Sequence, residues 1–317
     1  MSDPAQPSTD VSVVIVSWNV RELLGRCLAS VRASLAGSGY SCDMIVVDNA
    51  SHDGSAALVR AEFPDVRVIE TGANLGFAAG VNVGLEYAQG HWIFVLNPDT
   101  ELVGAALPTL LCFTAEHPAT AVIGPQLRYP DGAIQSSRRR FPTIPTYFFE
   151  STLLARWWPS NLWARRYHVA DVTPDEPQLV DWLVGAALLV RRTAIDHAGG
   201  MDARFWMYSE ELEWQRRLTR HGAIWYLPEA VVIHHEGKSS EQAPARKHLA
   251  FQRSKLRYAA RANGPAVATA LHIFLLACYA LDWLTEAAKW LLGHKRPLRR
   301  ERMQVYAQVL RGLVASC

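Results

Sequence analysis

The sequence of 317 residues lacks the features that define several common protein classes. It has only five cysteines, scattered along the chain without a CxxC motif: Cys27, Cys42, Cys112, Cys278 and Cys317. This spacing excludes a disulfide-based scaffold, argues against a cysteine-rich metal site and fits a reducing compartment. The first ten residues are polar, contain two prolines and lack the apolar core of a signal peptide, so we expect no export through a cleaved signal.

Glycine-rich phosphate-binding motifs are also missing. No GxGxxG follows the first predicted strand and no GxxxxGK[ST] occurs, so neither a Rossmann cofactor site nor a P-loop is expected. Hydrophobic residues make up 50% of the chain and charged residues 20%. This composition excludes wholesale disorder and provides enough apolar side chains for a full core.

The net charge of +2 is unevenly distributed along the chain. From Lys238 onward, 14 basic residues stand against four acidic ones, whereas residues 1–237 hold 18 basic and 26 acidic residues. A mildly acidic body followed by a strongly basic tail predicts that the tail faces something anionic. We expect no nucleic-acid partner, because the basic residues lie beside an apolar helix rather than with exposed aromatic side chains on a sheet.

The first hundred residues alternate short apolar runs with amphipathic stretches. The runs are rich in β-branched residues and predict strands at 11–17, 44–48, 66–70 and 92–96. The stretches between them predict helices at 21–35, 55–63 and 77–89. Strands alternating with helices form right-handed βαβ units, so we expect an open α/β sheet that binds ligands at the carboxyl ends of its strands.

Polar clusters stand where these ligand-binding ends are predicted. They are Ser17-Trp18-Asn19, the segment from Asp48 to Ser55, Asn74-Leu75-Gly76-Phe77 and Asn97-Pro98-Asp99. Parallel strands end at one edge of a sheet, so we expect all four clusters to meet there.

The second half of the predicted domain is less regular. Residues 125–180 are rich in Pro, Trp and Arg and indicate either a long insertion or a partly ordered region on the acceptor side. Trp182–Val190 has the pattern of one buried strand, a helix follows to His221, and a strand at 230–233 leads to His234.

Two groups of residues could carry chemistry. Asp99 ends a strand, where such residues are often turn residues, but with His234 at the same edge it forms a candidate site for a divalent metal. Glu210, Glu211 and Glu213 open a helix, where acids complement the helix dipole. The aromatic residues around them would raise their pKa values and suit general-base chemistry, and we expect only one of the three to reach the reaction.

The tail is apolar for sixteen residues, Ala266–Leu281, which is shorter than the ~20 residues that cross a bilayer. Basic clusters flank this run on both sides. The pattern fits helices lying in an anionic membrane surface, and it also fits a helical hairpin packed on the domain. The basic flanks favour the membrane.

The ordered motifs resemble family 2 glycosyltransferases of the GT-A fold. The resemblance rests on VSVVIVSWN, VVDNASHDGS, NLGFAAGVNVG and LNPD, and it covers roughly residues 11–240. DWLVGAALLVRR, GGMDARFWMYSEELEW and HHEGKSS extend it to bacterial rhamnosyltransferase-like members. The resemblance implies a GT-A domain at 11–240 with an open, mostly parallel sheet flanked by helices. Together with the composition of the two ends, we expect a disordered segment at 1–10 and a helical membrane-associating region at 241–317.

The resemblance also implies roles for individual residues. Six would bind the donor nucleotide: Ser17, Asn19, Asp48, Asn74, Asn82 and Asn97, the last replacing the first acid of the family's DXD-like motif. Asp99 and His234 would hold Mn²⁺ or Mg²⁺. Glu211 would be the catalytic base, at a position where the family usually has Asp. Three further residues would lie near the acceptor: Trp182, Glu210 and Glu213, the last also replacing a usual Asp.

The implied activity is inverting, metal-dependent transfer of a sugar for cell-envelope polysaccharide assembly. The resemblance favours L-rhamnose from dTDP-L-rhamnose as the donor and a glycan or polyprenyl-linked acceptor, at the cytoplasmic face of a bacterial inner membrane, with peripheral attachment. One alternative is a UDP-hexose or UDP-N-acetylhexosamine donor. Another is a non-catalytic, membrane-associated protein that binds sugar nucleotides or glycans. The Asp-to-Glu departures favour this last reading, and the presence of Asp48, Asp99 and His234 together argues against it.

Overall fold

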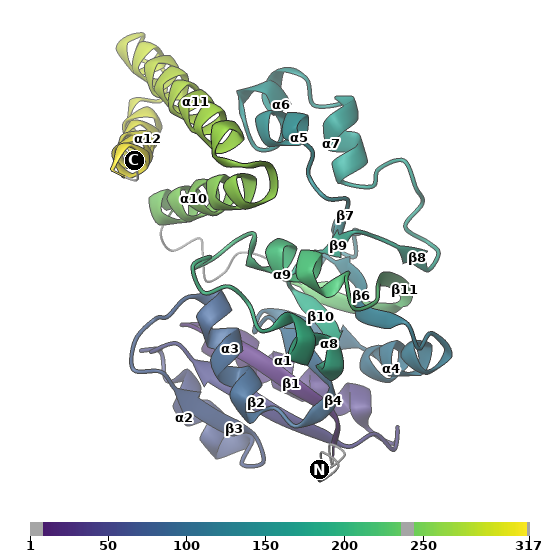
Figure 1. Cartoon of the computed structure of the whole chain (residues 1–317). Helices are drawn as coiled ribbons and strands as arrows, with labels where there is room; N and C mark the ends of the chain where they lie inside the picture. The colour runs from purple at the N-terminus through teal and green to yellow at the C-terminus, as the bar shows by residue number, and fades with distance from the viewer. Residues whose placement is uncertain (1–8, 236–243, 316–317) are drawn as a thin grey trace. The chain divides into compact units, whose positions relative to one another are not determined.

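The computed structural model describes residues 9–235 and 244–315. The chain forms two compact units, which are described separately (Figure 1). The α/β unit comprises residues 1–141, 168–206 and 210–239. The helical unit comprises residues 142–167, 207–209 and 240–317.

Within the described residues, the α/β unit is built on a nine-stranded sheet with the order β3-β2-β1-β4-β10-β6-β11-β5, and β8 pairs beside β11. The neighbours from β3 to β4 are parallel, and β10 runs antiparallel to both β4 and β6. The strands are β1 Thr9–Ser17, β2 Cys42–Asp48, β3 Arg67–Glu70, β4 Gly90–Leu96, β5 Thr100–Val103, β6 Thr120–Arg128, β8 Gln178–Leu179, β10 Ala187–Arg191 and β11 Ala223–His234. A separate two-stranded ribbon pairs β7 Arg138–Arg139 with β9 Trp182–Leu183.

Helices cover both faces of this sheet. Side chains alternate across a strand, so β1 sends Val13 and Ile15 into one core cluster and Val14 and Val16 into the other. The first cluster packs under α1, α2 and α4, and the second under α3, α8 and α9. These helices are α1 Arg21–Leu35, α2 Ser55–Glu62, α3 Phe77–Tyr87, α4 Ala106–Glu116, α8 Arg192–Ala198 and α9 Glu210–Leu218. The expected open α/β sheet, mostly parallel and flanked by helices, is confirmed.

Some element predictions were wrong in detail. β1 begins at Thr9, so Thr9 and Asp10 lie in a strand and not in the predicted disordered segment, and the rest of that prediction, residues 1–8, lies outside the described residues. The single strand predicted at 182–190 is broken into β9 and β10 by a turn at 184–186. A Cβ on Gly185 in this turn would lie 3.1 Å from the Cβ of Glu211, so the break allows close packing of the turn on α9.

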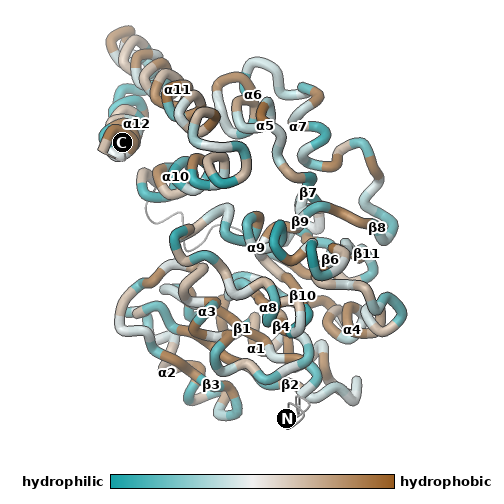
Figure 2. The backbone as a smooth tube through the Cα atoms, in the orientation of Figure 1, coloured by the Kyte–Doolittle hydropathy of each residue, from teal (hydrophilic) through white to brown (hydrophobic). Residues whose placement is uncertain are grey.

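The helical unit consists of helices packed on one another. They are α5 Ile144–Phe149, α6 Leu153–Trp157, α7 Leu162–Tyr167, α10 Pro244–Asn263, α11 Pro265–Leu291 and α12 Arg296–Val314. The sixteen-residue apolar run lies inside α11, which has 27 residues and whose trace is coloured as hydrophobic over much of its length in Figure 2. By length and composition, α11 is the one helix in the described ranges that could cross a membrane.

Candidate active site

The ends of β1 and β2 present two buried polar atoms without hydrogen-bond partners. Ser17 and Asp48 stand side by side in the parallel register, and they are 0% and 1% exposed. Asp48 Oδ1 accepts a hydrogen bond from the Ser51 N–H at 2.6 Å, whereas Asp48 Oδ2 and Ser17 Oγ have no partner in the structure. A buried polar atom left unpaired costs about 1–3 kcal/mol, so these two atoms are suited to bind a polar ligand.

Asn19 and Asn74 hold the loops around this pair. Asn19, with a positive φ of 53°, accepts from the His52 N–H through Oδ1 at 2.8 Å. Asn74 Oδ1 accepts from the Gly76 N–H at 3.0 Å. These two hydrogen bonds fix the loops that follow the strand ends, and direct contact of either side chain with a nucleotide stays a prediction.

Asp99 and His234 come together because β5, directly after Asp99, pairs with the end of β11. In this register His234 lies opposite Thr100, and His234 Nε2 is 3.4 Å from Asp99 Oδ1. Both residues are buried. Gln135 Oε1 lies 2.9 Å from His234 Nδ1, where it can accept the proton of that nitrogen, and Nε2 is the ring nitrogen that faces Asp99.

This pair has the chemistry of an open metal site. A carboxylate oxygen and a neutral imidazole nitrogen suit Mn²⁺ or Mg²⁺, which commonly complete their coordination with substrate phosphates and water. The searched part of the chain holds no cluster of three or more His, Cys, Asp or Glu residues that could bind a metal alone. Asp99 and His234 therefore fit a metal that arrives with a diphosphate.

Asn97 connects this edge to the turn between β9 and β10. Its backbone N–H donates to the Ala186 carbonyl at 2.9 Å, and its own carbonyl accepts from Thr100 Oγ1 at 2.7 Å. The backbone of Asn97 thus links the chain just before Asp99 to the turn that contains Gly185. A contact between the Asn97 side chain and the donor stays a prediction.

At the first turn of α9, Glu210 is buried, and its neighbour Glu211 is partly exposed as a residue but has a buried carboxyl oxygen. Burial, and then repulsion from Glu211, raises the pKa of Glu210 well above its usual range. Burial also raises the pKa of Glu211, but hydrogen bonds from backbone N–H groups, including that of Gly185, oppose this rise. Glu211 is therefore the member that ionises more readily. Within the described residues, Oε2 of Glu211 and Oε2 of Glu210 both lack a hydrogen-bond partner.

Gln215 positions α9 against the β9 strand. Its Oε1 accepts from the Leu183 N–H at 2.9 Å and its Nε2 donates to the Leu183 carbonyl at 2.7 Å. Gln215 is fully buried, one helical turn after Glu211. The sequence analysis missed this residue and Gln135. A polar residue at the i+4 position from the predicted base was the available signal for Gln215.

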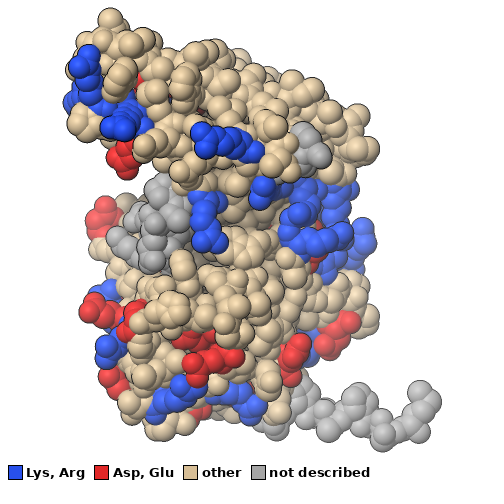
Figure 3. Space-filling model, turned by 90° about the vertical axis from the view of Figure 1, so that its left-hand side faces the viewer, with Lys and Arg blue, Asp and Glu red and all other residues tan. Residues whose placement is uncertain are grey.

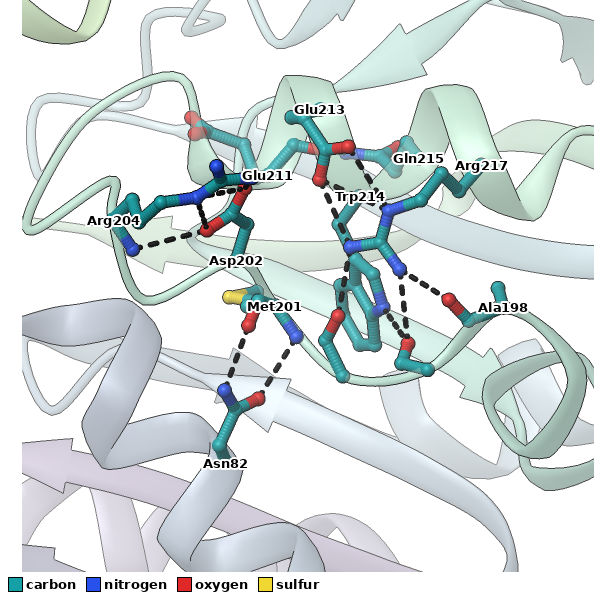
Figure 4. A network of polar contacts seen from close by, with 12 residues as sticks. Asn82, Ala198, Met201, Asp202, Arg204, Glu211, Glu213, Trp214, Gln215 and Arg217 are labelled. Atoms are coloured by element: carbon teal, nitrogen blue, oxygen red, sulfur yellow. Dashed lines mark hydrogen bonds and ion pairs between the residues drawn. The ribbon is translucent and has the colours of Figure 1, made fainter.

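Glu213 belongs to a different network, shown in Figure 4. Both of its oxygens accept from Arg217, at 2.9 to 3.0 Å. Arg217 also donates to the carbonyls of Ala198 and Gly200. Glu213 thus fixes the guanidinium that holds the segment from residue 198 to 200.

Asn82 and Trp214 also hold this stretch of chain, which is taken below as residues 198–202 (Figure 4). Asn82 donates through Nδ2 to the Met201 carbonyl at 2.7 Å and accepts through Oδ1 from the Met201 N–H at 2.8 Å. The Trp214 indole donates to the Gly199 carbonyl at 2.9 Å. In this structure Asn82 links α3 to the 198–202 segment, and its predicted place in the nucleotide pocket stays a prediction.

Trp182 is buried in β9, where its indole N–H donates to the Arg140 carbonyl at 3.1 Å. The Arg139 guanidinium lies 6.0 Å from the centre of its ring. A contact of Trp182 with an acceptor also stays a prediction.

The sequence matches the model of the family described as Glycosyl transferase family 2 over residues 12–170. It is 34% identical over 255 residues to the N-acetylglucosaminyl-diphospho-decaprenol L-rhamnosyltransferase of Mycobacterium tuberculosis, a match covering 76% of this chain and 81% of the relative. The chain belongs to glycosyl transferase family 2. Within it, the chain is rhamnosyltransferase-like, as the motifs predicted.

Two further similarities agree with this family. A low-salt glycan biosynthesis hexosyltransferase of Haloferax volcanii is 25% identical over 217 residues, covering 67% of this chain and 62% of the relative. The mannosyltransferase PcManGT from Pyrobaculum calidifontis, solved in complex with GDP-Man and Mn²⁺, superposes with a TM-score of 0.55. That match spans 98% of this chain and 90% of the neighbour at 16% identity, and it supports the GT-A fold. The protein is a glycosyltransferase.

Proposed function

We propose that this glycosyltransferase moves L-rhamnose from dTDP-L-rhamnose, with inversion, to a polyprenyl-diphosphate-linked acceptor bearing an N-acetylhexosamine. The observation that carries the proposal is the carboxyl group of Glu211, whose buried Oε2 has no hydrogen-bond partner among the described residues. It belongs to a chain that is 34% identical to a rhamnosyltransferase named for such an acceptor. The enzyme would work peripherally at the cytoplasmic face of a bacterial inner membrane, where polyprenyl-linked acceptors are met.

The donor nucleotide would bind at the ends of β1 and β2. Asp48 Oδ2 would accept from an N–H of the pyrimidine base, and Ser17 Oγ would bond a second polar atom of the nucleoside. Each bond would relieve a buried atom that has no partner in the structure. Binding energy is favourable here because the protein has already excluded water from both groups.

The metal would be held by Asp99 and His234 together with the donor diphosphate. When bound, it would supply Lewis-acid stabilisation of the charge on the leaving nucleoside diphosphate. Gln135 would keep His234 in the tautomer whose Nε2 can act as a ligand, because its carbonyl accepts the Nδ1 proton.

Glu211 would take the proton from the attacking acceptor hydroxyl. Burial raises its pKa and makes it a stronger base, while the hydrogen bond from Gly185 holds its carboxylate in place. Glu210, with its higher pKa, would keep its own proton and avoid repulsion with the ionised base. A single displacement at the anomeric carbon needs one base at the reacting centre and gives inversion.

A donor panel tests the proposal. Purified protein is incubated with dTDP-, UDP- and GDP-sugars, with Mn²⁺, Mg²⁺ or a chelator, and with detergent-solubilised N-acetylglucosaminyl-diphospho-polyprenol. Metal-dependent transfer from dTDP-L-rhamnose alone is expected. Transfer from a UDP-hexose instead would show that dTDP-L-rhamnose is not the donor. Binding of a sugar nucleotide without transfer to any acceptor would favour the non-catalytic alternative.

A further inference from the structure

The hairpin formed by α11 and α12 ends in a turn of unusual composition. The turn joins Leu291, the last residue of α11, to Arg296, the first of α12, and contains Gly293 and Lys295, both with positive φ. Leu291 is 70% exposed and Leu292 is 85% exposed, with Trp290 partly exposed beside them. Three consecutive large apolar residues at a solvent-exposed turn are unfavourable in water and need a cover.

Polar partners hold α11 inside the helical unit along its C-terminal half. Glu286 accepts from Arg299 of α12 at 2.7 Å, and both side chains are at least nine-tenths buried. Asp282 pairs with Arg156 of α6 at 2.9 Å, and the Tyr279 hydroxyl accepts from Gln252 at 3.2 Å. If α11 crossed a bilayer, these groups and α12 would enter hydrocarbon with it, which is costly. The part of the hairpin that can contact a membrane is therefore its tip, and not the whole length of α11.

Cations surround the apolar tip. From Lys289 to Arg302 the chain has six basic residues and one acidic residue, Glu301. A hollow of about 850 Å³ at this end of the hairpin is lined by Trp290, Arg296 and Arg300, among others. The Arg296 guanidinium lies 5.5 Å from the centre of the Trp290 ring, and its Nε donates to the Trp290 carbonyl at 3.2 Å.

The charge near the tip is visible in the space-filling view. Figure 3 shows a group of blue side chains at the upper left of the molecule, surrounded by tan ones. An anionic membrane surface has a layer of lipid phosphates above the upper part of the acyl chains. The arginines near the tip suit the phosphates, and the tryptophan and two leucines suit the acyl chains.

We propose that the hairpin tip, residues 289–302, is a docking site for an anionic lipid bilayer. Trp290, Leu291 and Leu292 insert at the level of the acyl-chain boundary, and Arg296 and Arg300 bind headgroup phosphates in the hollow beside Trp290. The inference deepens the membrane attachment within the proposed function by naming its contact surface. It is independent of the donor sugar and of the metal.

The test uses the full-length protein and sedimentation with vesicles. The probes are phosphatidylcholine vesicles and vesicles with about one third phosphatidylglycerol, because only the latter carry the negative surface. The apolar variant is Leu291→Glu with Leu292→Glu. Its matched control is Leu179→Glu with Val172→Glu, which changes two exposed apolar residues of the α/β unit. Circular dichroism melting confirms that each variant folds.

The wild-type protein is expected to sediment with the anionic vesicles, and the Leu291→Glu/Leu292→Glu variant to lose at least about tenfold in partitioning. Arg296→Gln with Arg300→Gln is expected to lose about 25-fold, since each surface cation contributes about fivefold. Arg60→Gln with Arg67→Gln, the control for charge, should bind like the wild type. Binding of the tip variants equal to wild type, or equal wild-type binding to neutral vesicles, would overturn the proposal.

A second readout separates this inference from the proposed function. In detergent, with a solubilised acceptor, the tip variants should keep wild-type transfer rates because the α/β unit is unchanged. If the wild type sediments with anionic vesicles but transfers no sugar in detergent, the proposed function fails and the docking site stands. If it transfers sugar but binds no vesicles, the docking site fails alone.

Discussion

Two regions of the α/β unit contain buried or half-buried polar side chains, and they differ in how many of the polar atoms are hydrogen-bonded within the protein. One region is the group of side chains that holds segment 198–202, called the anchor below. In it, the carboxylate of Glu213 and the amide of Asn82 each make two or more hydrogen bonds within the protein. At the strand edge, Asp48 and Glu211 each keep one buried oxygen without a partner. Bonded groups hold the scaffold, whereas unpaired groups at a ligand-binding edge are available to substrate.

The largest effect is expected for Glu211→Gln, which removes the base and keeps the shape of the side chain. Turnover should fall by about 10³-fold, within the range for loss of a general base. The dissociation constant of the donor should change little. Glu211→Asp restores a carboxylate one methylene shorter and should recover part of the rate. Stopped-assay kinetics with calorimetric donor titration measure both quantities, and a Gln variant with wild-type turnover would remove Glu211 from the reaction.

Next in size is Glu213→Gln, which should act on stability instead. Arg217 would lose its carboxylate partner in a buried setting, at a cost of about 3 kcal/mol in the free energy of unfolding. Urea unfolding measures this loss, and the exposed Glu229→Gln serves as the control. If Glu213→Gln instead left stability unchanged and abolished turnover, the division between anchor and strand edge would be wrong.

Asp48→Asn should weaken donor binding with a smaller effect. The new side-chain amide can place an N–H against the N–H of the nucleobase, so donor affinity should fall by about 30-fold, or about 2 kcal/mol.

Asn82→Ala tests the hydrogen-bonded region around residues 198–202, and it should lower the melting temperature with little change in donor affinity. Calorimetry of both variants with dTDP decides between them, and equal losses of affinity would place Asn82 in the nucleotide pocket.

The smallest effect concerns Glu210 and depends on pH. Its folded pKa lies above its unfolded value, so the side chain destabilises the fold increasingly as pH rises above the ordinary carboxyl pKa. Glu210→Gln should therefore raise stability by about 1 kcal/mol or more at pH 8 and have little effect at pH 4. Thermal unfolding at the two pH values measures the difference. A stabilisation equal at both would show that burial does not raise this pKa.

The sequence predicted the α/β fold well because its strands are apolar on both faces and alternate with helices. It also predicted that Asp99 and His234 lie at one edge of the sheet, since both stand at strand ends. It did not predict the break at Gly185, because an apolar run such as WLVGAALLV has the same pattern whether or not a neighbouring helix packs into it. The parts played by Gln135 and Gln215 depend on contacts between distant segments, which local patterns do not contain.

The central claim is that Glu211 carries catalysis at an edge whose other unpaired atoms bind the donor. It is tested most directly by titrating dTDP-L-rhamnose with Mn²⁺ into the wild-type protein and Glu211→Gln, and by following transfer to N-acetylglucosaminyl-diphospho-polyprenol with the same samples. We predict equal donor affinity in the two proteins and transfer in the wild type alone. Loss of donor binding in Glu211→Gln, or transfer by it at the wild-type rate, would contradict the account.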